Sequence, residues 1–284
     1  MSTASQIIEK IMKDPAGLSL LVVHAHPDDE TLATGPLIAG LADSGAHIDV
    51  LMCTRGERGE VVPGVLPAGL TPAQLIVQRE RELETACDLL GVRKQYFLGA
   101  SPFRAPAHQG RHYEDSGMEW VTPTLAGPAA DASENSLTSS SKNEEIHDLL
   151  NGLHQGTGFG GANHNWSAVI SYDDGGGYGH PDHVRAHLIA AAAAKKAGLP
   201  FVQIVSNDDA ITTTDSSTAS WYSRDDVRTR DVVIEALRAY RTQLSVLGTA
   251  SDGTESAEAT DDLHIRHVGG QRQEIPQRIG LIPG

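Results

Sequence analysis

The chain alternates between short apolar runs and longer segments whose apolar residues have helical spacing, and this alternation constrains the fold more than any other feature. The opening run, "LSLLVVHA" (18–25), is apolar almost throughout and contains β-branched residues, as strands buried on both faces do. The clearest helix is predicted at 71–92, with Thr71 as N-cap, Pro72 in the first turn and Gly91 at the end. Similar patterns predict further strands at 46–54, 94–99, 167–172 and 200–206, and further helices at 35–45, 143–154, 181–198 and 230–247.

Strands that alternate with helices predict a mainly parallel sheet with helices on both faces. We therefore expect an α/β fold, a Rossmann-like three-layer sandwich with a smaller irregular or β portion at the C-terminal end. The 284 residues suit one large domain. We expect a single domain over 1–284, with a Rossmann-like core at 1–205 and a C-terminal extension at 206–284 that packs on the functional site.

One long segment, 99–142, interrupts the alternation because it is rich in Pro, Gly, Ser and charge and has no sustained periodicity. A loop of this length inside a compact domain is usually functional or disordered. The half up to Trp120 contains histidines, arginines and aromatic residues, and we expect it to line a site. We expect the half at 124–142 to be flexible surface.

Composition limits the partners and the compartment. The formal net charge of −15 repels phosphate backbones, so we expect no nucleic-acid partner. No apolar run approaches the roughly 20 residues of a membrane span, and the N-terminal segment lacks the pattern of a secretory signal. Cys53 and Cys87 each lie in an apolar context, which favours buried free thiols in a reduced compartment. These features predict a cytoplasmic protein with no membrane partner, and they leave the oligomeric state unknown.

Two turns rich in charged residues or glycine follow predicted strands, at the end of the sheet where α/β proteins bind ligands. One is "HAHPDDE" after 18–25, and the other is "YDDGGGYGHPDH" after 167–172. Neither matches the glycine spacing of dinucleotide sites. The P-loop and the serine-hydrolase elbow G-x-S-x-G are also absent from the sequence.

The residue types in these turns favour a metal site instead. The first turn offers His26 with the adjacent pair Asp28 and Asp29, and the second offers His180 and His183. Catalytic zinc takes three protein ligands from His and Asp or Glu and leaves one position open. Neither turn holds enough ligands alone, so we expect the two strand ends to converge. One of the two aspartates is expected to bind the metal and the other to act as general base, and the residue types leave open which does which.

"AHPDDE" after the first strand, together with "HPDH" at the start of a later helix, resembles the zinc-dependent N-acetylglucosaminyl-phosphatidylinositol de-N-acetylase superfamily. "TRGERGE", "RERELETACDLLGV", "YFLG", "EDSGM", "GGGYGHPDH" and "GGQR" match as well, so the resemblance covers nearly the whole chain. Within the superfamily, the combination is most similar to the actinobacterial deacetylases of mycothiol biosynthesis, which act on N-acetylglucosaminyl-inositol. The resemblance implies a Rossmann-like fold and amide hydrolysis with a Zn²⁺ ion, for which Fe²⁺ is the alternative.

The resemblance assigns roles to the residues of both turns. It places the metal ligands at His26, Asp29 and His183, and the general base at Asp28. It implies that His180 assists at the transition state or protonates the leaving amine. Each of these residues matches a position of the two family motifs.

Further roles follow from the same resemblance. Asp182 would orient or tune the first histidine of "HPDH", and Tyr178 would polarise the amide carbonyl. Glu57, Arg79 and Asp115 match positions that surround the sugar and inositol. Arg79 also has a simpler interpretation, as part of a solvated, charged helix face.

Three residues near the motifs and two alternative functions complete the expectations. His187 is expected to be a helix-face residue and His24 a structural one, while Glu30 is expected to support His26 or Asp29. The related mycothiol S-conjugate amidases share these motifs. They tend to carry a lysine shortly after "DDE", where this chain has "TLATG", which favours the biosynthetic deacetylase. Deacetylation of another N-acetylglucosamine derivative is a further alternative.

Overall fold

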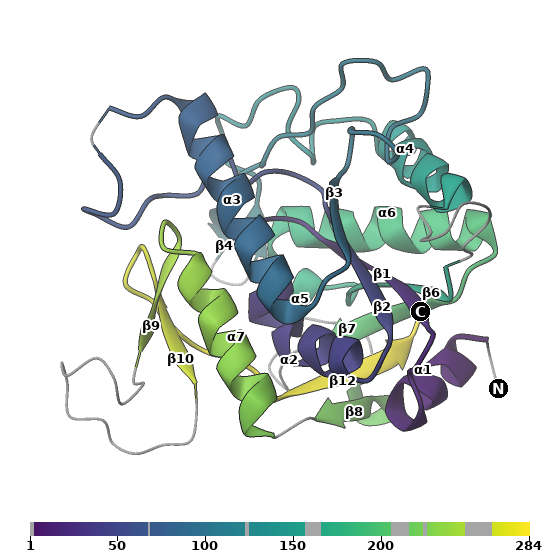
Figure 1. The fold of residues 1–284 in the computed structure, drawn as a ribbon. Helices are drawn as coiled ribbons and strands as arrows, with labels where there is room; N and C mark the ends of the chain where they lie inside the picture. The colour runs from purple at the N-terminus through teal and green to yellow at the C-terminus, as the bar shows by residue number, and fades with distance from the viewer. Residues whose placement is uncertain are drawn as a thin grey trace.

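The computed structural model describes residues 3–67, 69–122, 125–156, 166–205, 216–223, 226–247 and 263–284. A seven-stranded sheet with the order β3-β2-β1-β6-β7-β12-β8 forms its centre (Figure 1). The five strands from β3 to β7 in this order run parallel, and β12 is antiparallel to both of its neighbours. The strands are β1 (Ser19–His24), β2 (His47–Met52), β3 (Lys94–Phe97), β6 (Ala168–Tyr172), β7 (Phe201–Val205), β8 (Ser220–Ser223) and β12 (Arg278–Pro283).

Helices cover both faces of this sheet. Crossover connections between parallel strands are right-handed, so helices that lead towards β3 and helices that lead towards β7 lie on opposite faces. Accordingly, α2 and α3 pack with α7, whereas α4 packs with α6 (Figure 1). This arrangement confirms the predicted three-layer α/β fold. The helices are α1 (Thr3–Lys13), α2 (Asp29–Asp43), α3 (Pro72–Leu90), α4 (Lys142–Gln155), α5 (Gly176–Gly179), α6 (Pro181–Ala197) and α7 (Val227–Ala239), with a 3-10 turn at Ser216–Thr218.

Helix α3 shows why the clearest sequence signals were reliable. The Thr71 side chain accepts a hydrogen bond from the Gln74 backbone N–H, and the Gln74 side chain accepts one from Thr71, which completes a capping box. Gly91 ends the helix in the left-handed conformation, at φ 81°. Both ends therefore satisfy backbone groups that a helix leaves unpaired, and the predicted bounds are confirmed to within two residues.

Two predicted helices differ from the structure. Helix α2 begins at Asp29, so the expected start at 35 is wrong, and Pro36 lies inside the helix. Acidic side chains are favourable in a first helical turn, and this brings Asp29 and Glu30 into the helix. The helix predicted at 230–247 is wrong in its second half, because α7 ends at Ala239.

The chain after α7 forms strands instead. The strands β9 (Leu244–Leu247), β10 (His264–His267) and β11 (Arg272–Glu274) form a small antiparallel sheet. This sheet is the expected smaller β portion at the C-terminal end. Two other strands of the extension, β8 and β12, instead complete the central sheet. The described residues contain no helix that is long and apolar enough to cross a bilayer.

The segment at 125–142 is not simply an exposed surface. It begins with β5 (Leu125–Gly127), which pairs with β4 (Glu119–Thr122), and Ser136 and Leu137 are buried. The Thr138 hydroxyl donates a hydrogen bond to Ser116 Oγ at 2.9 Å. The expectation of surface agrees with the exposed or half-buried residues at 128–135 and is wrong at 136–137, which are buried against the rest of the protein.

Candidate metal centre and active site

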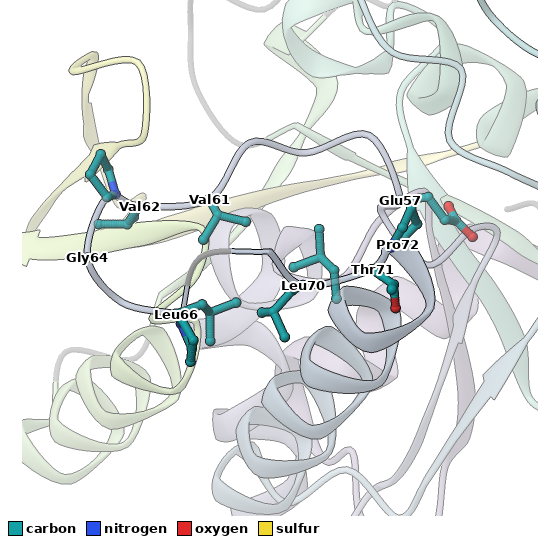
Figure 2. Close-up of a pocket in the computed structure, with 11 residues that line it drawn as sticks. Glu57, Val61, Val62, Gly64, Leu66, Leu70, Thr71 and Pro72 are labelled. Carbon is teal, nitrogen blue, oxygen red and sulfur yellow. The ribbon is translucent and has the colours of Figure 1, made fainter.

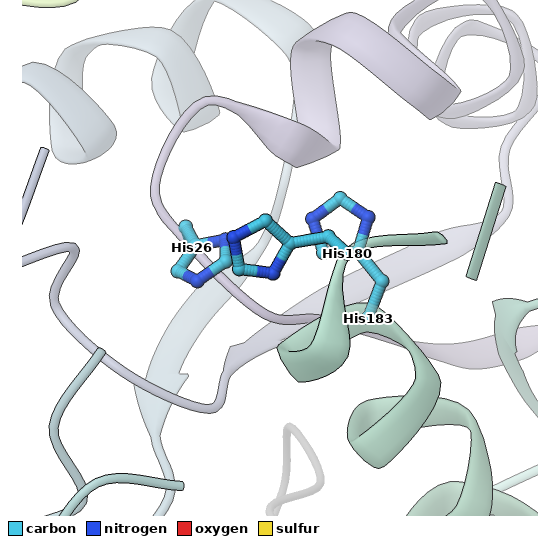
Figure 3. A group of neighbouring side chains, drawn as sticks. All are labelled: His26, His180 and His183. Atoms are coloured by element: carbon cyan, nitrogen blue, oxygen red, sulfur yellow. The ribbon is translucent and has the colours of Figure 1, made fainter. Parts of the chain in front are cut away.

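The two charged turns meet where the connectivity of the sheet reverses. β1 and β6 are neighbouring parallel strands, and the chain leaves β1 towards one side of the sheet and β6 towards the other. Such a switch point leaves a crevice at the carboxyl ends of the strands. His26 follows β1, and its ring centroid lies 4.7 Å from that of His180 and 5.4 Å from that of His183 (Figure 3). The predicted convergence of the two strand ends is thus confirmed.

The turn after β1 has an unusual backbone that other residues hold in place. Asp28 has φ 106°, a conformation that residues with a side chain rarely adopt. Its backbone N–H donates a hydrogen bond to Glu30 Oε2 at 3.1 Å. The Tyr240 hydroxyl donates to Glu30 Oε1 at 2.6 Å, and the Thr31 hydroxyl donates to the same oxygen. Glu30 therefore contacts the backbone of Asp28, and no hydrogen bond between its side chain and His26 or Asp29 is observed among the described residues.

Burial raises the pKa of Glu30 to about 7, against the opposing effect of these hydrogen bonds. Tyr240 follows α7, 210 positions along the chain from Glu30, so no local sequence pattern pointed to it. Burial, together with Asp29 and Glu30, raises the pKa of Asp28 well above its ordinary value. The general base expected from the resemblance therefore lies in a crowded group of acids.

The turn after β6 requires glycine and sets the orientation of His180. A Cβ atom on Gly176 would lie 2.7 Å from the backbone nitrogen of Val184, so any larger residue would collide with α6. His180 is the N-cap of α6, and its Nδ1 accepts a hydrogen bond from the Asp182 backbone N–H at 3.2 Å. A neutral His180 ring with Nδ1 as acceptor carries its proton on Nε2. Burial and the neighbouring His26 lower the pKa of His180, which favours this neutral form.

Potential metal ligands from both turns surround Asp29. Asp29 Oδ2 lies 3.3 Å from His26 Nδ1 and 3.3 Å from His183 Nε2. His183 Nδ1 donates to the Gly176 carbonyl at 3.2 Å, so in the neutral ring Nε2 is an acceptor. That nitrogen is buried and has no hydrogen-bond partner among the residues that the structure describes.

These observations test whether the residues fit a metal ion. An acceptor nitrogen that faces a carboxylate oxygen inside the protein is unfavourable unless a cation lies between them. Nitrogen and carboxylate donors of this kind suit Zn²⁺ or Fe²⁺. The residues at this site therefore fit a divalent cation.

The described parts of the chain contain two groups of potential ligand atoms, and within each group all atoms lie within 4.8 Å of one another. The first group is His26, His180 and His183, and the second is His26, Asp115 and Asp182. Neither group is the expected set with Asp29, so the choice of ligands within the cluster stays a prediction. Burial lowers the pKa of His26, but the negatively charged Asp115 and Asp182 outweigh it, so the pKa of His26 is raised well above its ordinary value.

The Asp182 carboxylate contacts the other motif. Its Oδ2 lies 3.1 Å from His26 Nε2 and accepts a hydrogen bond from the Ser116 N–H at 2.9 Å. Toward His180, Asp182 offers its backbone N–H. A carboxylate that holds one nitrogen of a histidine directs the other nitrogen towards a metal. The expected role of Asp182 on His180 thus corresponds to a backbone contact, and its side chain positions His26.

Two tyrosines border the histidines. The side chain of Tyr178 is 54% exposed, and its ring centroid lies 5.1 Å from that of His183 and 6.1 Å from that of His180. Tyr178 therefore lies at the solvent side of the cluster. Tyr172, which the motifs did not single out, stacks on His183 with ring centroids 4.3 Å apart, and its hydroxyl accepts from the Ala25 N–H.

The three expected substrate contacts lie in different surroundings. Glu57 Oε2 accepts from the Asp115 N–H at 3.0 Å, and Asp115 Oδ1 lies 3.6 Å from His26 Nε2. Arg79 is 2% exposed, so its interpretation as part of a solvated helix face is wrong. Its guanidinium donates to the backbone carbonyls of residues 59 and 60. Arg79 thus holds the loop that follows β2, whereas Asp115 contacts the histidine cluster and Glu57 is joined to it through the Asp115 backbone.

The remaining histidines of the two motifs have hydrogen bonds typical of structural residues. His24 is buried, and its Nε2 lies 2.9 Å from Thr34 Oγ1. His187 Nδ1 donates to the Tyr172 carbonyl at 2.8 Å. Neither histidine belongs to the two groups of potential metal ligands found in the described ranges.

Fold and site together define an α/β protein with a candidate His/Asp metal centre at a topological switch point. A family model described as GlcNAc-PI de-N-acetylase (PIG-L) matches residues 21–194. The chain belongs to this family, which confirms the resemblance found in the motifs. The match includes both charged turns and ends before β7.

Curated relatives share one name. A 1D-myo-inositol 2-acetamido-2-deoxy-alpha-D-glucopyranoside deacetylase of Kineococcus radiotolerans is 36% identical over 202 residues, which cover 66% of this chain and 51% of the relative. A protein of the same name from Saccharomonospora viridis is 32% identical over 257 residues, covering 80% of this chain and 85% of the relative. The chain thus spans about half the length of the first relative.

Among solved structures, the chain is similar to an N,N'-diacetylchitobiose deacetylase from Pyrococcus horikoshii. The TM-score is 0.52 at 18% identity, and the similarity covers 85% of this chain and 80% of that one. This likeness concerns the fold, and it agrees with the Rossmann-like arrangement described above.

Proposed function

We propose that this protein is a metal-dependent amide hydrolase that removes the N-acetyl group from 1D-myo-inositol 2-acetamido-2-deoxy-alpha-D-glucopyranoside, a step of mycothiol biosynthesis. The observation that carries the proposal is the convergence of His26, Asp29 and His183, with the buried, unpartnered Nε2 of His183 directed at Asp29. Membership of the de-N-acetylase family and the shared name of the curated relatives support the same reaction. Zn²⁺ is the expected ion, and Fe²⁺ suits the same donors.

The residues around the cluster divide the work of amide hydrolysis. A divalent cation bound here acts as a Lewis acid and lowers the pKa of water. Asp28 is the proposed general base that removes a proton from the attacking water. His180 in its neutral form carries its proton on Nε2 and is oriented to donate a hydrogen bond to the developing oxyanion, while Asp28 passes the proton that it took from water to the departing amine. Tyr178 would stabilise the oxyanion, and a donor of this type contributes about 2.7–4 kcal/mol in known enzymes.

Polar side chains next to the cluster suit a sugar and a polyol. Asp115 lies beside His26 and its backbone N–H donates to Glu57, so both carboxylates are near the place where hydroxyl groups of a glycoside need partners. Arg79 contributes by fixing the loop that carries Glu57. This proposal assigns substrate binding to the two acids and a positioning role to the arginine.

The test combines metal content with product formation. Elemental analysis of anaerobically purified protein should find about one Zn or Fe ion per chain, and removal of the ion with a chelator should abolish amine release from N-acetylglucosaminyl-inositol. The rates at which the wild-type protein releases amine from N-acetylglucosaminyl-inositol and from a mycothiol S-conjugate, measured side by side, separate the deacetylase from the amidase. Protein that holds no metal and hydrolyses no N-acetylglucosamine derivative would contradict the proposal.

Substitution of the general base is the sharpest change within this site. Asp28→Asn keeps the shape of the side chain, and asparagine tolerates positive φ better than most residues. We expect kcat to fall about 10²–10⁴-fold while metal content stays the same. Asp88→Asn, at an exposed position of α3, is the matched control and should retain full activity. Wild-type turnover by Asp28→Asn would exclude Asp28 as the base.

A further inference from the structure

An open pocket of about 370 Å³ lies between the loop that follows β2 and the first turn of α3 (Figure 2). Aliphatic side chains dominate its walls, and each of them is only half buried. These aliphatic side chains include Val61, Val62, Leu66, Leu70 and Leu75. Small-molecule sites are typically concave, mostly apolar and of this size. The roles assigned above to the candidate site do not account for this pocket.

The walls of the pocket are fixed by hydrogen bonds at several points. The Val62 N–H donates to the Thr242 carbonyl at 2.9 Å, which joins the loop to the segment after α7. Arg79 donates to the carbonyls of residues 59 and 60, and the capping box of Thr71 fixes the start of α3. A preformed pocket loses less entropy when it binds a ligand than a pocket that must first be ordered.

Glu57 connects the pocket to the candidate active site. It lies at the Pro72 end of the pocket, and its carboxylate points away from the aliphatic side chains (Figure 2). The same carboxylate accepts from the Asp115 N–H at 3.0 Å, and Asp115 lies 3.6 Å from His26. The aliphatic pocket therefore lies on one side of Glu57, and the polar site lies on the other.

We propose that this pocket binds the apolar aglycone of an N-acetylglucosamine glycoside whose sugar lies beside Glu57 and Asp115. The proposal rests on the proposed hydrolysis of N-acetylglucosaminides and extends its substrates beyond inositol glycosides. Inositol does not suit the aliphatic walls, because each hydroxyl buried without a partner is unfavourable. An alkyl chain suits them, since each methylene that is removed from water strengthens binding about fourfold.

The activity test uses the metal-loaded full chain and a series of methyl, butyl and octyl N-acetylglucosaminides. We expect kcat/KM for amine release to rise at least about tenfold from methyl to octyl, mainly through a lower KM. Leu66→Asp and Leu70→Asp should remove this gain and leave hydrolysis of N-acetylglucosaminyl-inositol within about twofold. Leu89→Asp is the matched control, because Leu89 is 42% exposed on α3 and does not line the pocket. Equal kcat/KM for the methyl and octyl glycosides would overturn the proposal.

A binding measurement separates this proposal from the proposed function. Octyl glucoside has no amide, so calorimetric titration below its micelle concentration tests the pocket without hydrolysis. Binding that Leu70→Asp weakens about tenfold, and that Leu89→Asp preserves, supports the pocket even if the protein hydrolyses none of the glycosides. If octyl glucoside binds wild type and Leu70→Asp equally well, the aglycone site is excluded, whatever the outcome for N-acetylglucosaminyl-inositol.

Discussion

Two buried glutamates on opposite faces of the central sheet have similar burial but different surroundings. Burial raises the pKa of Glu30 in α2 to about 7 and that of Glu145 in α4 to about 8. Glu30 accepts hydrogen bonds from Asp28, Thr31 and Tyr240. In the described part of the chain, neither carboxylate oxygen of Glu145 has a hydrogen-bond partner, and Arg185 Nε lies 3.7 Å away. Ionisation of either acid destabilises the fold, because both pKa values are raised, but only Glu30 has hydrogen-bond donors that make it an organiser of the site.

Among changes to these two glutamates and to Tyr240, the largest expected effect is the loss of this organisation. Glu30→Gln replaces one acceptor oxygen by an amide nitrogen, so either the Asp28 N–H or the two hydroxyls lose their partner. A displacement of about 1 Å at a reacting group costs on the order of 10²-fold in rate. We expect kcat to fall about 10- to 100-fold, with KM and metal content nearly unchanged, as measured by steady-state kinetics and elemental analysis.

The same chemical change on the other face is the control for this variant. Glu145→Gln should alter kcat by less than about twofold, because no hydrogen bond joins Glu145 to the histidine cluster within the described residues. Equal kcat values for Glu30→Gln and wild type would show that Glu30 does not organise the active site.

The second prediction concerns stability and pH. The pKa of Glu145 is about 8 in the folded protein, above its ordinary value of 4.5, so the folded state keeps a proton that the unfolded chain has lost. Stability therefore falls as pH rises from about 4.5 to about 8. Glu145→Gln should be more stable than wild type by roughly 2–4 kcal/mol at pH 9, and by much less near pH 4.5. Denaturant unfolding at both pH values measures this, and a pH-independent difference would contradict the assignment.

The smallest expected effect comes from removing one of the hydrogen-bond donors to Glu30. Tyr240→Phe removes a buried hydroxyl that donates at 2.6 Å and leaves the ring in place. We expect a loss of about 1–2 kcal/mol in the free energy of unfolding and a several-fold lower kcat, since Thr31 still donates to the same oxygen. Unfolding and kinetic measurements on the same preparation check both values. A loss of stability without any change in kcat would limit Tyr240 to a structural role.

Local patterns in the sequence predicted most of the core. The apolar runs of β1 and β6 and the caps of α3 and α6 are written in consecutive residues, so their positions could be read directly. The two strand-end motifs converge because neighbouring parallel strands end at the same edge of the sheet. The main parts of the candidate site could therefore be predicted from the sequence.

Contacts between distant segments could not be predicted in this way. Tyr240 reaches Glu30, and Asp182 reaches His26, across 210 and 156 positions of the chain, so no spacing rule identifies either pair. The helix predicted at 230–247 failed for a related reason, because pairing with β10 makes a strand of Leu244–Leu247. Tertiary packing decided these features.

The central sheet also depends on residues outside the family match. β12 pairs with β7, and every residue of β7 is buried. Without β12, the apolar segment Phe201–Val205 would become an edge strand with unpaired backbone groups, which is a template for aggregation. β12 thus covers this edge of β7, and a core shortened at residue 205 would expose the edge to pairing with other chains.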